Sequence, residues 1–92
     1  LNFVLEQLRE VPDVHSRRMF SGFGLYRGEQ FFGIVSGGRV YFKTNKHTRK
    51  KYEDRGMQPF RPSAKQTLKN YFEVPSDILE DSSELARWVM GM

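Results

Sequence analysis

The sequence predicts an α+β fold in which helices flank an antiparallel sheet. Apolar residues recur at helical spacing near both ends of the chain, over residues 1–11 and 82–92. Between these ends lie short extended segments separated by glycine-rich or polar turns. The expected element order is therefore α-β(3)-α-β(2)-α, in which the first three strands form a meander. Because 92 residues make one domain, residues 1–92 are expected to fold as a single unit.

The first helix is predicted from an apolar stripe, and Pro12 ends it. Residues 16–27 are then expected to form one extended strand that Gly22 and Gly24 interrupt. A glycine inside a strand marks a bulge or a place where two backbones approach closely. The stripe of the first helix consists of Leu1, Val4, Leu5 and Leu8.

The same two glycines raise the alternative of a phosphate-binding loop. A dinucleotide-binding fingerprint has the pattern G-x-G-x-x-G and leads into a helix. Here Arg27 occupies the position of the third glycine, and the segment that follows is another strand. The chain also lacks the Gly-Lys-Ser/Thr sequence of a Walker loop. We therefore predict that the glycines shape the sheet.

A hairpin is predicted from two further extended segments, residues 31–35 and 39–43. A Gly-Gly pair lies between them, and two glycines tolerate the positive φ angles of a tight hairpin turn. Alternation along residues 39–43 places Val40 and Phe42 on one face of the strand. The other face presents basic and aromatic groups together, namely Arg39, Tyr41 and Lys43.

The last third of the chain is predicted to contain two extended segments and a helix. An extended piece begins at residues 59–61, a polar loop covers residues 62–68, and a strand covers residues 70–74. Asp81 and Glu84 have the spacing of a capping box at the start of the final helix. The apolar face of that helix consists of Leu85, Trp88, Val89 and Met92.

Charge is distributed unevenly along the chain, although the net charge is only +4. Basic residues concentrate in residues 39–69, where only Glu53 and Asp54 oppose them. A helix capped by Thr44 or Asn45 and ended by Gly56 is expected within this region. We call residues 43–55 the basic segment. Its basic residues are Lys43, Lys46, Arg49, Lys50, Lys51 and Arg55.

Two interpretations of the basic segment remain open. In the first, its side chains form a face that neutralises the phosphates of a nucleic acid, and Tyr41 of the neighbouring strand stacks on a base. In the second, the segment is a solvated helix face on which Glu53 and Asp54 pair locally with the basic side chains. The salt dependence of binding separates the two, because neutralised phosphates release counterions.

No group of residues in the sequence indicates catalysis, so we predict no catalytic residue, no cofactor and no metal. The chain has no cysteine, which excludes thiolate chemistry and fits a reducing cytoplasm. His15 and His47 lack ligand spacing, and Met19 replaces the glycine that a nucleophile elbow at Ser21 needs. An enzyme that joins His15 or His47 to an acid is a third hypothesis. The apolar runs are too short to span a bilayer, so no membrane association is expected.

Several ordered motifs resemble the N-terminal domain of the TfoX (Sxy) family over nearly the whole chain. The stretch RRMFSGFGLYRG is followed by FFGIVSGGRVYFKT, PFRP and NYFEVP, in the order that the family shows. Ser21 replaces a more usual glycine in the first motif, which is a small-for-small change. The residues that match the family motifs are Met19, Phe20, Gly22, Phe23, Gly24, Leu25, Tyr26, Tyr41, Phe42, Lys43, Tyr71, Val74 and Pro75.

The resemblance implies an α-β(3)-α-β(2)-α fold similar to secretion-chaperone folds, and it supplies no catalytic residue. It also implies a transcriptional co-regulator of natural competence that acts with the cyclic-AMP receptor protein. Full-length members carry a helical C-terminal domain, which is expected to be missing from this chain. We therefore expect a cytoplasmic, non-enzymatic protein-interaction domain whose partners are a transcription factor, DNA or a second copy. Direct nucleic-acid binding through the basic segment is the alternative.

Overall fold

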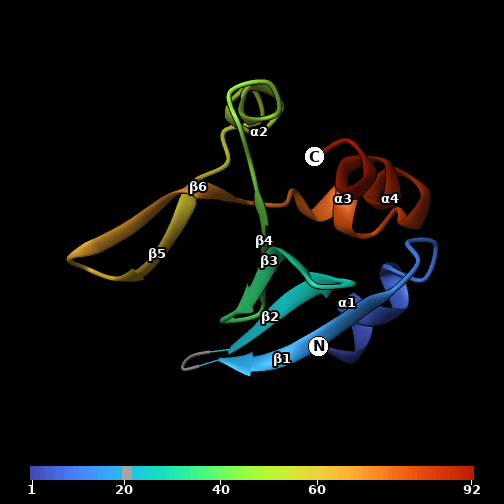
Figure 1. Cartoon of the computed structure of the whole chain (residues 1–92). Helices are drawn as coiled ribbons and strands as arrows, with labels where there is room; N and C mark the ends of the chain where they lie inside the picture. Colours follow the sequence, from blue (N-terminus) through green and yellow to red (C-terminus); the bar gives the residue numbers. More distant parts are fainter. Residues whose placement is uncertain (20–21) are drawn as a thin grey trace.

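Six antiparallel strands form one open sheet, with helices near both ends of the chain (Figure 1). The computed structural model describes residues 1–19 and 22–92, so Phe20 and Ser21 lie outside the described residues. The strands are Val14–Met19 (β1), Gly22–Arg27 (β2), Gln30–Ser36 (β3), Arg39–Lys43 (β4), Pro59–Ser63 (β5) and Gln66–Glu73 (β6). The helices are Asn2–Gln7 (α1), Arg49–Glu53 (α2), Ser76–Leu79 (α3) and Ser82–Met90 (α4). Across the sheet the strands lie in the order β1-β2-β3-β4-β6-β5, which confirms the α+β class.

The first half of the chain contains one strand more than expected. The prediction of a single strand over residues 16–27 is wrong, because β1 and β2 pair with each other as an antiparallel hairpin. Val14 lies opposite Arg27, and Met19 lies opposite Gly22. Alternation of side chains indicates which residues share a face, but it does not indicate where the chain reverses direction. The observed order is therefore α-β(4)-α-β(2)-α(2), and the meander has four strands.

Gly22 and Gly24 confirm the prediction that these glycines shape the sheet. Gly22 lies so close to β3 that a methyl group at its Cα would collide with the carbonyl oxygen of Val35. A methyl group on Gly24 would lie 2.8 Å from the ring of Phe31. Gly22 therefore needs to lack a side chain for β2 and β3 to pack at their observed separation, and Gly24 leaves room for the neighbouring side chains.

A β-bulge in β3 determines which of two adjacent phenylalanines joins the core. Leu25 pairs with Gly33 but Tyr26 pairs with Phe31, which makes Phe32 the extra residue. Phe32 is buried in the core, whereas the Phe31 ring lies against Tyr26 on the opposite face. A regular strand would exchange the two rings, because side chains alternate between faces.

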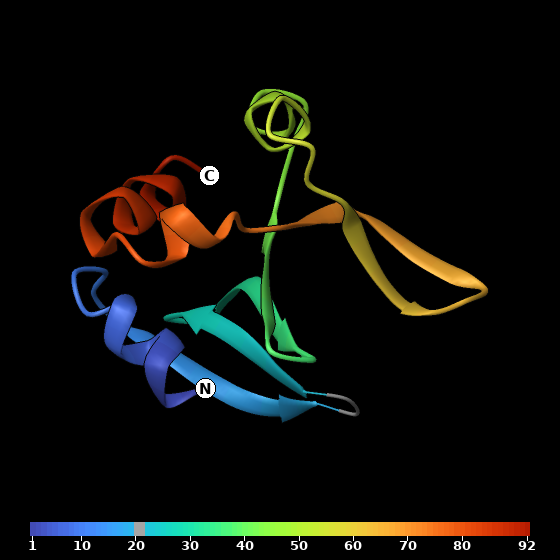
Figure 2. The same ribbon diagram turned by 180° about the vertical axis from the view of Figure 1, so that it is seen from behind.

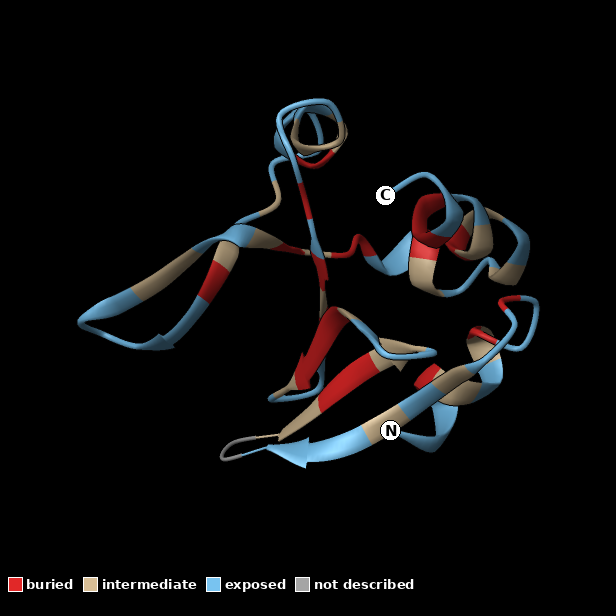
Figure 3. Cartoon of the chain, viewed as in Figure 1, coloured by how far each residue is buried: buried red, intermediate tan, exposed pale blue. Residues whose placement is uncertain are grey.

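The hydrophobic core lies between one face of the sheet and the helices. Figure 3 shows buried residues gathered in the central strands and the facing helices, while β1 and the tip of the β5–β6 hairpin are mostly exposed. Seen from behind in Figure 2, that hairpin extends away from α1, α3 and α4. We call the face of the sheet that points away from this core the open face. The least exposed core side chains are Leu8, Leu25, Phe42, Tyr52 and Leu85.

The helix of the basic segment is shorter than expected. The side-chain oxygen of Asn45 accepts hydrogen bonds from the backbone N–H groups of His47 (2.8 Å) and Thr48 (3.0 Å). This Asx turn holds residues 45–48 outside the regular helix, so α2 begins only at Arg49. Gly56 adopts a φ of 71° just beyond the helix, which confirms the predicted helix end.

The last third of the chain is more regular than expected. The prediction of a polar loop over residues 62–68 is wrong, because β5 and β6 continue into this range and only a tight turn separates them. A strand with polar side chains has weak alternation, and that weakness explains the error. The predicted cap of the final helix is confirmed, since the Asp81 carboxylate accepts a hydrogen bond from the backbone N–H of Glu84 at 3.1 Å.

Candidate functional site

The basic segment is spread over four successive parts of the fold. Its cations lie at the end of β4 (Lys43), in the Asx turn (Lys46), in α2 (Arg49, Lys50, Lys51) and after α2 (Arg55). Lys43 and Lys46 are exposed, and neither forms an ion pair within residues 1–19 and 22–92. These two side chains are therefore the cations of the segment that are available to a partner without breaking a pair.

Two of the α2 cations have polar partners inside the protein. The guanidinium of Arg49 donates a hydrogen bond of 3.2 Å to the side-chain oxygen of Asn70. The Lys50 amine lies 3.3 Å from the Asp54 carboxylate, one helical turn away, and both side chains are largely exposed. Exposed pairs of this kind contribute little free energy, so Lys50 can exchange Asp54 for a phosphate at small cost.

The other two cations hold α2 against the C-terminal helices. The Lys51 amine lies 4.4 Å from the centroid of the Trp88 ring, and the Arg55 guanidinium carbon lies 5.8 Å from it. Arg55 also donates hydrogen bonds of 2.9 and 2.8 Å to the two carboxylate oxygens of Asp77. These hydrogen bonds lower the pKa of Asp77, and partial burial lowers the pKa of the Lys51 amine. Both cations therefore contribute to packing as well as to surface charge.

A continuous row of rings crosses the open face. His15 stacks on Tyr26 with ring centroids 5.5 Å apart, and Tyr26 meets the Phe31 ring edge-to-face at 5.3 Å. The Phe31 ring in turn lies 5.7 Å from the ring of Tyr71. His15 is exposed and the other three residues are half-buried, so this row lies at the surface. We call these four residues the ring ladder.

Basic side chains accompany the ring ladder. The Arg17 guanidinium carbon lies 4.9 Å from the centroid of the Tyr26 ring, and Lys43 is the cross-strand partner of Tyr71. The only acidic residue in the six described strands is Glu73, which pairs with Arg39 at 2.9 Å. The open face therefore combines exposed rings with unopposed positive charge.

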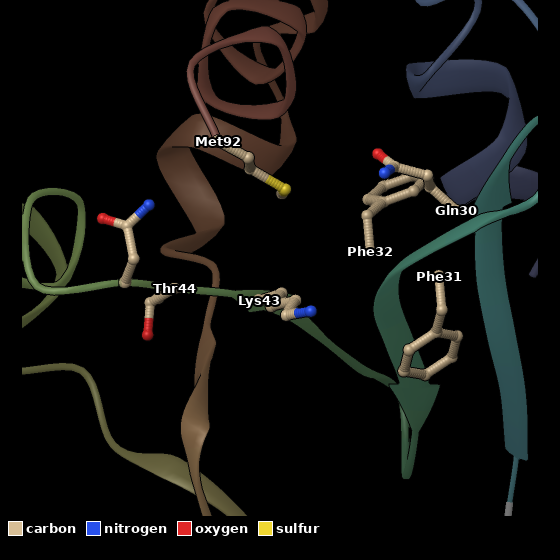
Figure 4. A pocket seen from close by; sticks show the side chains of 7 residues that line it. Gln30, Phe31, Phe32, Lys43, Thr44 and Met92 are labelled. Carbon is tan, nitrogen blue, oxygen red and sulfur yellow. The ribbon is translucent and has the colours of Figure 1, made fainter.

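A cavity of about 380 Å³ lies beside the ladder, where β3 and β4 diverge (Figure 4). Figure 4 shows Phe31 and Phe32 directed to opposite sides of β3, and the Lys43 amine directed from β4 toward β3. A volume of this size lies within the range of small-ligand pockets. The cavity is lined by Gln30, Phe31, Phe32, Lys43, Thr44, Asn45 and Met92.

The matched motif residues divide between the core and the open face. Tyr26 and Tyr71 belong to the ring ladder, Met19 is exposed at the end of β1, and Pro75 is buried just before α3. Partial burial raises the pKa of Tyr71. Phe20 of the first motif lies outside the described residues. The motif therefore supports both the packing of the sheet and the surface that the sheet presents.

Sequence reasoning missed three residues of this surface: His15, Arg17 and Phe31. Alternation within β1 would have placed the first two on one face, once the strand was known to begin at Val14. No sequence signal marks the bulge that places Phe31 there. Tyr41, which stacks on a base in one of the two interpretations of the basic segment, contacts Phe60 with ring centroids 4.6 Å apart. It is therefore partly covered by the β5–β6 hairpin.

The described part of the chain shows neither a metal-binding cluster nor a membrane-spanning helix. No three His, Asp or Glu side chains among residues 1–19 and 22–92 gather closely enough to hold a metal ion. His15 belongs to the ladder in β1, whereas His47 lies in the Asx turn before α2. No helix in the described ranges is long and apolar enough to cross a membrane.

Comparison with known proteins agrees with the resemblance seen in the sequence. The TfoX N-terminal domain family matches residues 6–91. The DNA transformation protein TfoX1 of Aliivibrio fischeri is 32% identical over 75 residues, which cover 79% of this chain and 34% of that protein. The chain thus spans about a third of the length of this curated relative. Since the match includes all six strands and the whole of the final helix, the chain belongs to the TfoX N-terminal domain family.

Proposed function

We propose that this chain is a non-enzymatic regulatory domain of natural competence. The observation that carries the proposal is the family match over residues 6–91, joined to a relative named as a DNA transformation protein. A domain that performs no chemistry regulates by binding, so we propose a protein-interaction domain. Its partner in this proposal is a transcription factor such as the cyclic-AMP receptor protein, and a second copy of the chain is a further partner. Because transcription takes place in the bacterial cytoplasm, the proposal locates the domain there.

Exposed apolar side chains support a protein partner. Phe3 in α1 is 55% exposed and Met90 in α4 is 52% exposed. Aromatic residues and methionine are enriched in the cores of protein interfaces, where a partner removes them from water. Among the described residues, the other large exposed apolar side chains are Leu1, Met19 and Met92.

We expect the domain to bind the cyclic-AMP receptor protein, and we expect a Phe3→Ser, Met90→Ser variant to bind at least about fivefold more weakly. Biolayer interferometry with and without cyclic AMP measures this affinity, and sedimentation velocity measures self-association. A Lys65→Gln variant at the tip of the β5–β6 hairpin is the control and should bind like the parent. A domain that stays monomeric and does not bind the receptor protein would contradict the proposal.

A second candidate function is direct binding of duplex DNA through the basic segment. Lys43 and Lys46 favour it, since both are exposed and neither is ion-paired within the described residues. Long-range attraction of the positively charged region also accelerates encounter with a polyanion.

For this candidate we expect the affinity for a labelled duplex to fall steeply with salt in a fluorescence anisotropy series. A Lys46→Gln, Lys50→Gln variant should lower the slope of log K against log salt by about 0.9 for each phosphate that the variant no longer neutralises. The charge-matched control is Arg9→Gln, Lys65→Gln, which removes two charges outside the basic segment. Equal slopes for the two variants, or no binding at low salt, would exclude the basic segment as the duplex contact.

A further inference from the structure

The open face of the sheet has a composition that neither the competence proposal nor the basic segment uses. Its rings form an unbroken row from β1 to β6, through successive contacts of 5.5, 5.3 and 5.7 Å. Helices cover the other face, and α1, α3 and α4 lie together on that side in Figures 1 and 2. The row is thus left accessible, whereas Tyr41, which is outside the row, lies against the hairpin residue Phe60.

The bulge in β3 is what completes this row. It directs Phe31 to the open face, between Tyr26 and Tyr71, while Phe32 fills the core. Without the bulge, Phe32 would lie on the open face in place of Phe31, and Phe31 would enter the core. The bulge thus keeps one ring in the core and places the other between Tyr26 and Tyr71, which is a reason to look for a ligand of that ring.

The spacing of charge along the ladder fits a polyanion whose bases are unpaired. Arg17 lies over Tyr26 near one end of the row, and Lys43 lies beside Tyr71 at the other end. Glu73 is the only carboxylate of the described strands, and Arg39 neutralises it at 2.9 Å. A protein partner with an acidic surface would satisfy the cations, but it would not supply a succession of bases to stack on the rings. A duplex would hide its bases from those rings, because they are stacked within the helix.

The cavity beside Lys43 offers a binding place for a single nucleotide in addition to the stacking surface. Its volume of about 380 Å³ opens next to Phe31, the central ring of the ladder. Gln30 and Asn45 provide amide groups at its lining, and Lys43 provides a cation. Amides hydrogen-bond the edges of bases, and an ammonium group binds phosphate as a point charge. A base turned out of the strand therefore finds a ring, hydrogen-bonding groups and a cation in one place.

We propose that the open face binds single-stranded DNA, with bases stacked on Tyr26, Phe31 and Tyr71 and phosphates held by Arg17 and Lys43. Stacking on aromatic side chains along a positively charged surface is the general mode of sequence-tolerant single-strand binding. The choice of DNA over RNA rests on the proposed function, in which the domain works in the regulation of DNA uptake. The surface is distinct from the α2 part of the basic segment and shares with that segment only Lys43.

The test measures binding of a labelled ten-nucleotide oligothymidine, an oligouridine of the same length and a hairpin duplex by fluorescence anisotropy. We expect the oligothymidine to bind best. The Tyr26→Leu and Tyr71→Leu variants, which keep apolar volume but remove the ring, should each bind roughly 5- to 150-fold more weakly. The matched control is Phe3→Leu, which removes an exposed ring from α1. An Arg17→Gln, Lys43→Gln variant should lower the salt slope by about 0.7 per contact, the value for single strands.

A second measurement uses the unaltered protein, so its result does not depend on whether the variants fold. In the unaltered protein, oligothymidine should shift the NMR ring resonances of His15, Tyr26 and Tyr71 and leave those of Trp88 unchanged. Binding that is insensitive to the ladder variants, binding that is strongest for the duplex, or ring signals that do not move would overturn the proposal. A preference for oligouridine at the same rings would overturn the choice of DNA. None of these results depends on whether the domain binds the cyclic-AMP receptor protein, so the two proposals fail separately.

Discussion

Replacing Trp88 by alanine is expected to destabilise the domain by about 3–5 kcal/mol, the usual cost of removing a buried tryptophan ring. The Trp88 ring is almost fully buried and meets Tyr52 edge-to-face, with ring centroids 4.8 Å apart. It also carries Lys51 above its face at 4.4 Å. The variant therefore removes core contacts and the support of α2 together. Urea denaturation followed by circular dichroism measures the loss, and the melting temperature should fall by more than about 10 °C.

The Trp88→Phe variant is the matched control for this prediction. It keeps a ring against Tyr52 and should lose roughly 1–2 kcal/mol, since a smaller volume of contact is removed. The Trp88→Ala variant, by contrast, loses the ring that covers Lys51. The Lys51 amine, whose pKa is lowered by partial burial in the unaltered protein, should then be free. A Trp88→Ala variant as stable as the parent would mean that α2 is not anchored by the C-terminal helix.

Replacing Gly22 by alanine is expected to cost about 3 kcal/mol, the upper part of the range for overpacked sites. The added methyl group would meet the carbonyl oxygen of Val35, which belongs to the backbone of β3 and cannot rotate away. The two strands must separate to accept it, and their hydrogen bonds lengthen. Thermal unfolding measures the loss, and NMR should show the largest shift changes along β2 and β3.

The control for this prediction is Gly28→Ala in the turn between β2 and β3. Gly28 has a φ of 60° and open space around its Cα, so alanine there meets no atom and adds only backbone strain of about 1 kcal/mol. The comparison separates steric collision from loss of glycine's conformational freedom. Equal destabilisation of the two variants would show that the β2–β3 spacing tolerates a side chain at position 22.

Most of the fold follows from local patterns in the sequence, and the errors have local causes. The stripe of α4, the Gly-Gly hairpin and the cap at Asp81 were all predictable because each depends on residues within a few positions. The division of residues 14–27 into two strands was not predictable from alternation, since Val14 is the only apolar residue on the core side of β1 and this strand shows no clear apolar period. The early start of β6 was missed because Leu68 is the only apolar residue among its first four, which leaves no visible alternation.

The candidate surface was less predictable than the fold, because it depends on contacts between strands. The basic segment is visible in the sequence, but the attachment of Lys51 and Arg55 to Trp88 requires the packing of α2 on α4. The ring ladder gathers residues from four strands, and one of them reaches it only through the bulge. Neighbours in space that lie forty positions apart, such as Phe31 and Tyr71, share no sequence signal.

The two outer strands of the sheet differ in their capacity to accept another strand. Two of the five residues of β5 are prolines, Pro59 and Pro62, which donate no backbone hydrogen bond, whereas β1 contains none. Strand addition is therefore favoured only along β1. If two copies joined there, both outer margins of the combined sheet would be proline-bearing β5 strands. Assembly through strand edges then ends at a closed pair, and the fold is protected against growth into a fibre.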